Sequence, residues 1–583
     1  SDVVDRMAIV GKVFAELELY KGLTYNISFG GDYYGSHNDQ YRSSELPLLG
    51  QKYYDVKSNP TAYSSSGFYF NWLVENKINY NTTIKDAHSI NVVLVQSAQK
   101  ETYKGDNVTA TDFPNDYIQT ISGGTVTKGA SDKTQWTIAS YLARMQYSYK
   151  GKYMASASFR TDGSTNFGKD NRYGTFYSFS GSWLVSREAF MARQDVVSNL
   201  KLRMSCGTSG KEAGMDYLNY TLYSTSNTTF DYYRDHPVYQ SAYGATINQL
   251  GNDQLSWETA YNLNIGVDVA LLDNRISLSA DWYKRRNSDL IMSTTLPAAN
   301  GVGRQYQNVG EMENRGVELV LNTHTVKGED FNWFTTLTFS YNNNELTKLD
   351  QEKLTRSGYK TFYEGDNIDE LKKVKVMGVD PETGFAQYAR VEEDGSTNIV
   401  GSLSEAVLGN GELSYVNIGL SRAPYWGGFT NTFIYKNWEL YLHTTYSLDY
   451  KVYNSVLAEY TSGTSWTTSN RHKLPSGLKI WEKPGDKADI PMINADPAFV
   501  QELNSETSFC YTDASHLRIS NIRLTYNFPQ QWMKKICVQS AALSFSCDNV
   551  YTFASKYFAG MDPENVGGWA APRRFIFGLN VTF

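Results

Sequence analysis

The protein is a chain of 583 residues with 54 Lys and Arg against 61 Asp and Glu, which gives a formal net charge of −7. This mildly acidic balance offers no basic surface for a nucleic acid, so we expect no nucleic-acid partner. Aromatic residues make up 14% of the chain, including 44 tyrosines, although the mean hydropathy is −0.46. A high aromatic content combined with a hydrophilic mean hydropathy suits a protein wall that has one apolar face and one face in contact with water.

Apolar runs in the sequence are too short for a membrane-spanning helix, which needs roughly 18 apolar residues. Any spanning segment must therefore be a strand. The first 17 residues lack the charged start, apolar centre and small-residue cleavage site of a signal peptide. The four cysteines show no CxxC spacing and are too few to staple a chain of this length, so we interpret them as packing residues.

Strand patterns begin at residues 6–20 and recur at 152–160, and they become clearest at 261–269. There, alternate residues form one apolar face and one polar face, which suit hydrocarbon and water respectively. The apolar face consists of Tyr261, Leu263, Ile265, Val267 and Val269, and the polar face includes Asn262, Asn264 and Asp268.

The same alternation continues to the end of the chain. It recurs at 275–284, where Asp281 lies on the polar face, and at 317–323, 331–341, 521–528 and 541–549. The last ten residues place five apolar side chains on one face and end on Phe583, as expected of a strand that closes a membrane barrel. The five are Phe575, Phe577, Leu579, Val581 and Phe583.

Short and long connections alternate between these strands. The short ones have the composition of hairpin turns, with Gly and Asn expected to supply positive φ; they lie at 20–22, 84–86, 149–152, 272–275, 327–330 and 435–437. The long polar ones lie near 35–66, 101–132, 211–256, 346–420 and 453–512, with shorter ones near 161–172, 296–308 and 551–571. Every second connection of a meander lies on the same rim. The pattern therefore predicts an all-β, antiparallel transmembrane β-barrel with short periplasmic turns and large extracellular loops.

The patterns number about 17, and both terminal strands run toward the short-turn rim, so the count is odd. A single-chain bacterial barrel closes with an even number of strands. We therefore expect a preceding N-terminal part that supplies at least one more strand.

Several stretches match a known group of proteins. Near the C-terminus they read TDASHLRISNIRLTYNFP (512–529), DNVYTF (548–553), MDPE (561–564) and RRFIFGLNVTF (573–583). Earlier ones read RTDGSTNFG (160–168), SNLKLRMSCGTSG (198–210), NVGEMENRGVEL (308–319), YWGGFTNTFIYKNWEL (425–440) and WEKPGD (481–486). With these segments the chain resembles the SusC/RagA family of TonB-linked outer-membrane transporters. His516 and Cys547 depart from the pattern, where an aromatic and a polar residue are expected.

The resemblance implies an outer-membrane importer of oligosaccharides or oligopeptides that needs no cofactor. It implies a barrel of about 22 strands with a plugged lumen, energy supplied by TonB, ExbB and ExbD through a TonB box, and a SusD-like surface lipoprotein as partner. The family places a carboxypeptidase-regulatory-like domain, the TonB box and the plug before the barrel. None is visible here, so residues 1–583 are expected to be the C-terminal portion of the barrel.

Catalytic signatures are absent from the sequence, which has no HExxH, Walker A, GxGxxG helix opening or GxSxG motif. The seven histidines are scattered without metal-ligand spacing. Residues 380–384 and 394–396 lack the spaced acidic ligands of a calcium loop, so we interpret them as polar turns. We expect no enzyme and no metal site.

Aromatic side chains in the long loops are the candidate ligand or partner contacts, because a tyrosine offers a flat apolar face and a hydroxyl group. Packing inside the loop, or a place in the interfacial aromatic belt, is the more common role for such rings. Asn262, Asn264, Asp268 and Asp281 are candidates for the lumen wall, where a plug could cover them. The loop candidates are Tyr217, Tyr220, Tyr232, Tyr233, Arg234, Tyr239, Trp466 and Trp481.

Two other functions stay open at the level of sequence. A passive porin would conduct without TonB or a plug, and the large loops count against it. A soluble β-propeller with a glycan-active site would repeat a unit of roughly 40 to 50 residues, and no repeated signature is present.

Overall fold

A computed structural model describes residues 2–44, 59–212, 214–226, 244–297, 301–349, 354–356, 360–392, 394–409, 411–461, 477–493, 497–558, 561–568 and 570–583. Among these residues, no helix is both long and apolar enough to cross a membrane.

Seventeen strands join in a single sheet, which confirms the predicted strand number and the all-β antiparallel class. A propeller would divide its strands into separate small blades, so that alternative is wrong. The strands are β1 (Asp2–Tyr20), β2 (Leu23–Arg42), β3 (Thr61–Ile84), β4 (His88–Thr111), β5 (Thr125–Tyr149), β6 (Tyr153–Ser164), β7 (Tyr173–Leu184), β8 (Val197–Lys211), β11 (Glu258–Leu271), β12 (Ile276–Ser288), β15 (Glu311–Lys327), β16 (Phe331–Lys348), β24 (Tyr425–Tyr435), β25 (Trp438–Leu448), β28 (His516–Asn527), β29 (Ser540–Phe553) and β30 (Arg574–Thr582).

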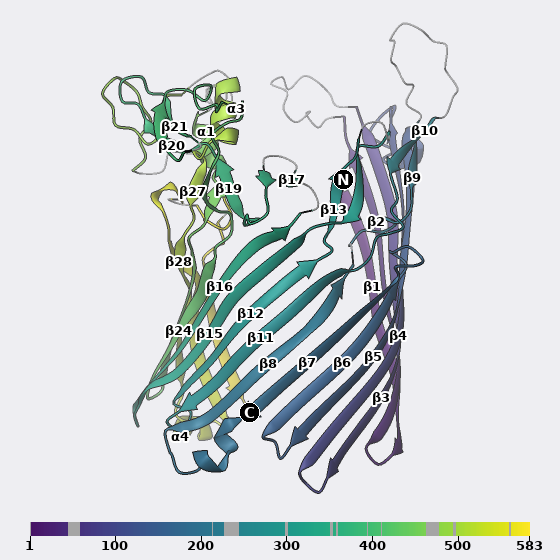
Figure 1. Ribbon diagram of the computed structural model, residues 1–583, viewed down its shortest axis with the longest axis vertical. Coiled ribbons are helices and arrows are strands. Elements are labelled where there is room, and N and C mark those ends of the chain that lie inside the picture. Colours follow the sequence, from purple (N-terminus) through teal and green to yellow (C-terminus); the bar gives the residue numbers. More distant parts are fainter. Residues whose placement is uncertain are drawn as a thin grey trace. The chain divides into compact units, whose positions relative to one another are not determined.

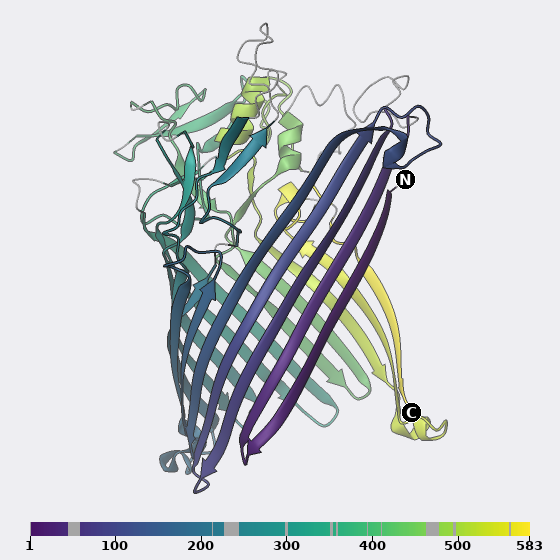
Figure 2. The same ribbon diagram turned by 90° about the vertical axis from the view of Figure 1, so that its right-hand side faces the viewer.

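The chain divides into two compact units. Unit 1 contains residues 1–183, 205–263 and 287–311, and unit 2 contains the remaining stretches, 184–204, 264–286 and 312–583. In unit 1 the strands β1 to β7 form an antiparallel meander in chain order. Figure 2 shows its first strands, in purple and blue, lying side by side along their whole length.

One face of the unit 1 meander is apolar and the other is polar. Near the short turns, a row of neighbouring rings runs across the apolar face from strand to strand, made by His88, Tyr149, Tyr153 and Trp183. Such a row has the composition of the aromatic girdle of a membrane barrel. On the opposite face, serine hydroxyls on β6 and β7 bond across the strands, as Ser156 does with Ser180 at 2.7 Å.

The short turns occur where the sequence predicts them, but Gly and Asn do not supply most of their positive φ angles. The left-handed positions include Lys85, Asp86, Lys150, Leu272 and Lys436, with φ between 51° and 54°. A tight hairpin needs this conformation to match the twist of its strands. The turn geometry therefore imposes it on residues that seldom adopt it alone.

The predicted long loops at 35–66 and 101–132 are wrong in extent, because the strands reach further than expected. Strand β2 continues to Arg42 and β3 begins at Thr61, while β4 continues to Thr111 and β5 begins at Thr125. Beyond the apolar band both faces of a strand meet water. Alternation then disappears from the sequence while backbone pairing continues.

In unit 2, strands β16, β24, β25, β28, β29 and β30 pair in that order, each antiparallel to the next. Strands β16, β24 and β28 are labelled in Figure 1. Their apolar face includes Phe433, Leu440, Leu524, Phe545 and Phe577, which lie opposite one another on successive strands. The alternation predicted for the C-terminal strand is thus confirmed. The strand ends at Thr582, one residue before the predicted end at Phe583, whose side chain is exposed.

The connections predicted as polar at 346–420 and 453–512 instead contain secondary structure and two apolar cores. One core joins Val374, Ala386, Tyr388, Ala406 and Leu503, and the other joins Val456, Leu457, Tyr460, Leu478 and Ile490. Their elements are β17 (Leu354–Arg356), β18 (Lys360–Phe362), β19 (Glu370–Lys373), β20 (Val376–Val379), β21 (Ala386–Val391), β22 (Thr397–Val400), β23 (Val416–Leu420), β26 (Lys451–Tyr453), α1 (Ser455–Thr461), α3 (Pro497–Glu506) and β27 (Tyr511–Asp513).

Smaller elements complete the remaining connections. They are β9 (Leu222–Ser226), β10 (Gly244–Gln249), β13 (Ile291–Thr295), β14 (Arg304–Asn308), α4 (Gln530–Lys534) and the short 3-10 helices η1 (Ile121–Gly123), η2 (Val185–Arg187), η3 (Ala189–Met191) and η5 (Lys556–Phe558).

Candidate functional site

Tyr217 and Tyr220, two of the loop candidates in unit 1, are close in the chain to Leu218. Leu218 belongs to an apolar cluster with Phe167, Phe176, Leu255 and Trp257. The hydroxyl of Tyr217 accepts the backbone N–H of Gln135 at 2.9 Å, and its ring lies 6.3 Å from that of Tyr220. The hydrogen bond holds Tyr217 against β5. The side chain of Tyr220 is 51% exposed and can contact a ligand. The other loop candidates, Tyr232, Tyr233, Arg234, Tyr239 and Trp466, lie outside the described residues.

Trp481 anchors the turn at residues 380–384. Its indole Nε1 donates to the carbonyl oxygen of Pro381 at 2.8 Å, and its ring lies where a side chain on Gly384 would have to go. Within this turn the Oδ1 of Asp380 accepts the backbone N–H of Glu382 at 2.9 Å, and that bond lowers the pKa of the half-buried Asp380 carboxyl. The segment has the geometry of a polar turn, as interpreted from the sequence.

Two of the predicted wall residues, Asp268 and Asp281, meet at one cation in unit 2. The guanidinium of Arg203 on β8 bonds both carboxylates, at 2.8 Å to Asp268 and 2.9 Å to Asp281. The hydroxyl of Ser279 donates to Asp268 at 2.8 Å. The other two wall candidates are separate, with Asn262 exposed and Asn264 half-buried. We did not single out Arg203 from the sequence, although it alternates with the exposed apolar residues Leu202 and Met204.

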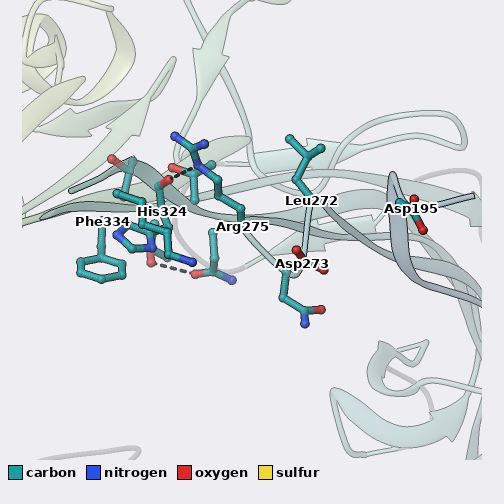
Figure 3. Close-up of a pocket in the computed structure, with 12 residues that line it drawn as sticks. Asp195, Leu272, Asp273, Arg275, His324 and Phe334 are labelled. Carbon is teal, nitrogen blue, oxygen red and sulfur yellow. Dashed lines mark hydrogen bonds between the residues drawn. The ribbon is translucent and has the colours of Figure 1, made fainter. Parts of the chain in front are cut away.

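A cavity of about 610 Å³ lies in unit 2 near the short turns (Figure 3). The ring of His324 on β15 stacks on Phe334 of β16 with centroids 4.2 Å apart, and its Nε2 lies 2.8 Å from Oδ1 of Asn332. The Nε of Arg275 donates to the carbonyl oxygen of His324 at 3.0 Å, which ties the β11–β12 turn to the end of β15. Asp195 also lines the cavity. Such a wall can bind and orient a polar ligand, and no sequence motif pointed to it.

A second ionic network holds the MDPE segment of unit 2 against β28. Arg518 donates to Asp562 at 2.6 Å and to Glu564 at 2.7 Å, and both Arg518 and Asp562 are buried. Burial alone would raise the pKa of Asp562, but the hydrogen bonds from Arg518 and from the backbone of Glu564 lower it. Burial also raises the pKa of the neighbouring Tyr450 to about 12. These charges have a structural role, because each is matched by a partner.

The groups described above are ion pairs, hydroxyls, amides and rings, which suit the binding of a polar ligand. In the part of the chain that the structure describes, no three His, Cys, Asp or Glu side chains gather where they could hold a metal ion. Burial raises the pKa of the Cys510 thiol, which keeps it protonated and unreactive. The polar face of the strands presents ion pairs, amides and hydroxyls.

Comparison with known proteins places this architecture in one group. The family model described as "TonB dependent receptor-like, beta-barrel" matches residues 13–550. TonB-dependent receptor P3 of Formosa agariphila is 30% identical over 546 residues, which cover 88% of this chain and 52% of that protein. TonB-dependent receptor SusC of Bacteroides thetaiotaomicron is 28% identical over 468 residues, covering 77% and 44% respectively. The chain thus spans about half the length of the curated relatives it matches.

Among solved structures, that of the RagAB peptide transporter superposes on the whole chain with a TM-score of 0.83 and 23% sequence identity. The match covers 62% of that chain. At this identity the likeness establishes the fold, and it agrees with the 17-stranded antiparallel sheet.

Proposed function

The chain belongs to the TonB-dependent receptor-like β-barrel family, and we propose that in the intact protein it forms the wall of an energised importer. The proposed cargo is an oligosaccharide or an oligopeptide. Members of the family are transporters rather than enzymes. The residues quoted above and the curated relatives place the chain with the SusC/RagA type.

The two faces of the strands are the observation that carries this proposal. The chain lies in the outer membrane as part of a β-barrel, so its apolar face meets lipid. The polar face, with Arg203, Asp268, Asp281 and the His324 cavity, then lines a water-filled interior. Antiparallel pairing between neighbouring strands satisfies their backbone groups inside the bilayer, as spanning strands require.

We assign the supply of energy and the gating of the barrel to parts of the intact protein that lie outside these 583 residues. The curated relatives are about twice as long as the region they share with it. We propose that the intact protein adds a plug inside the barrel and a TonB box that receives force from TonB, ExbB and ExbD. We also propose a SusD-like surface lipoprotein that covers the loop end and captures cargo.

The cargo proposal rests on the loops and on the relatives. Exposed rings such as Tyr220 and Tyr223 suit either a sugar ring or a peptide side chain. One structural neighbour is a peptide transporter, so we propose peptides as well as glycans as the cargo. The interior wall does not decide between them, because its amides, hydroxyls and paired charges suit both.

Uptake in whole cells tests this function. Labelled oligosaccharides and oligopeptides are offered to cells that carry the intact protein, with TonB present or deleted, and with or without the accessory lipoprotein. We expect one cargo class to accumulate only when TonB is present, and capture at low concentration to need the lipoprotein. Uptake that is unchanged by the loss of TonB, together with open conductance in planar bilayers, would instead establish a passive porin.

A further inference from the structure

A second cavity, of about 500 Å³, lies on β1 to β4 in unit 1. We call it the outward groove and define it by Asp5, Tyr33, His37, Ser66, Phe68 and Lys104. Gly35 forms its floor, since a side chain there would come within 3.0 Å of the Tyr33 hydroxyl. The groove therefore depends on a glycine placed between larger neighbours.

The strand register shows on which face the groove opens. Gly35 lies opposite Phe68, and Phe68 lies opposite Lys104, so these three residues lie on the same face of the sheet. Phe29 and Val74 are paired on the same face, six residues nearer the short turns on each strand. This is the apolar face, so the groove opens toward the membrane and away from the interior.

The height of the groove is set by strand length. His37 lies 14 residues after Leu23, the first residue of β2. At roughly 3.3 Å per residue and a tilt of about 45°, this distance corresponds to about 33 Å above the turn. The apolar band of an outer-membrane barrel is only about 25 Å tall. The groove thus lies just above the hydrocarbon, at the level of the outer lipid headgroups.

The groups in the groove match a phosphorylated sugar. Phe68 and Tyr33 stack with centroids 6.3 Å apart and form a flat apolar wall. The exposed Lys104 holds its Nζ 5.7 Å from the Phe68 centroid, where it can meet a phosphate. His37 is fixed by contacts of 2.8 Å to Ser66 and 3.0 Å to Asp39.

The acidic residues of the groove fit the same ligand. Asp5 and Asp106 line its rim and are exposed, so their carboxylates can accept hydrogen bonds from sugar hydroxyls. We propose that the outward groove binds the phosphorylated sugar headgroup of a glycolipid in the outer leaflet. This binding is separate from transport, because the groove opens on the face opposite the interior.

Lipid binding to the intact protein tests this site. The protein is reconstituted in phosphatidylcholine nanodiscs and titrated with a bis-phosphorylated diglucosamine lipid, with native mass spectrometry as the readout. The variant Lys104→Glu should weaken binding about fivefold or more, the effect of one surface cation on an anionic headgroup. Lys128→Glu is the matched control, because Lys128 is exposed and lies opposite Thr109, on the other face. The control should bind as the wild type does.

Three results would overturn the proposal. Equal binding by Lys104→Glu and wild type removes the groove from lipid recognition. Equal loss in Lys104→Glu and Lys128→Glu reduces the effect to overall charge. Binding of the acyl-free diglucosamine bisphosphate as tight as that of the lipid would make the groove a site for a soluble sugar phosphate.

Discussion

Replacing Arg518 by methionine should release the segment 561–568 from β28. Arg518 and Asp562 form a pair at 2.6 Å with side chains only 10% and 8% exposed. The methionine removes the cation and leaves the Asp562 carboxylate buried beside a single backbone donor, the N–H of Glu564 at 3.0 Å.

The expected cost follows from burial. Breaking a buried pair by removing one partner costs about 3–5 kcal/mol, because the other charge is left uncompensated. The contact with Glu564, whose side chain is 55% exposed, adds little, since exposed pairs contribute at most about 1 kcal/mol. We expect a loss of about 3 kcal/mol in the free energy of opening this segment, or roughly 100-fold in its opening equilibrium.

Amide hydrogen exchange of residues 561–568 measures that equilibrium directly. The control is Arg523→Met on the same strand, where the pair with Glu439 is longer, at 3.4 Å, and the side chains are 45% and 28% exposed. It should change stability by less than about 1 kcal/mol. Unchanged exchange in Arg518→Met, or an equal change in both variants, would refute the reasoning.

Three further outcomes are expected. In thermal unfolding, Gly427→Ala should cost about 1–3 kcal/mol, because its new methyl group would lie 2.1 Å from a backbone oxygen of β16; Gly11→Ala, with open space around it, should be close to neutral, and equal effects would contradict the packing argument. Trp481→Phe should loosen the 380–384 turn by about 1 kcal/mol through loss of its hydrogen bond to Pro381, seen as faster proteolysis there; unchanged cleavage would contradict this role. The pKa of Asp562 is lowered from 3.8, so its stabilisation is present above that pH and is lost as the pH falls through the lowered value; the opening equilibrium of 561–568, taken as the observed exchange rate divided by the intrinsic rate at each pH, should rise only below pH 3.8, and a rise of this ratio near neutral pH would contradict the assignment.

The strands could be predicted from sequence because alternation is a local property. Phe545 and Phe577 each reveal their face by their immediate neighbours, and the register then brings them opposite one another. The prediction failed where that signal ends. The stretch Lys104 to Asn107 continues β4 although it no longer alternates between apolar and polar residues.

Contacts between distant residues were beyond the sequence. The core that joins Val374 to Leu503 is built from segments that both read as polar loops, since each supplies only a few apolar side chains. The pair Arg518–Asp562 spans 44 residues, and its two motifs gave no indication that they meet. The Arg203 cluster depends likewise on β8, β11 and β12 bringing three side chains together.

The central claim is that these strands form a wall between lipid and a water-filled interior. Nitroxide labels placed singly along β16 of the intact protein in lipid test it, by collision with dissolved oxygen and with a water-soluble nickel chelate. We expect labels at Trp333, Leu337 and Phe339 to favour oxygen, and labels at Thr336 and Thr338 to favour the chelate. Uniform access to the chelate along the strand, without alternation, would contradict the claim.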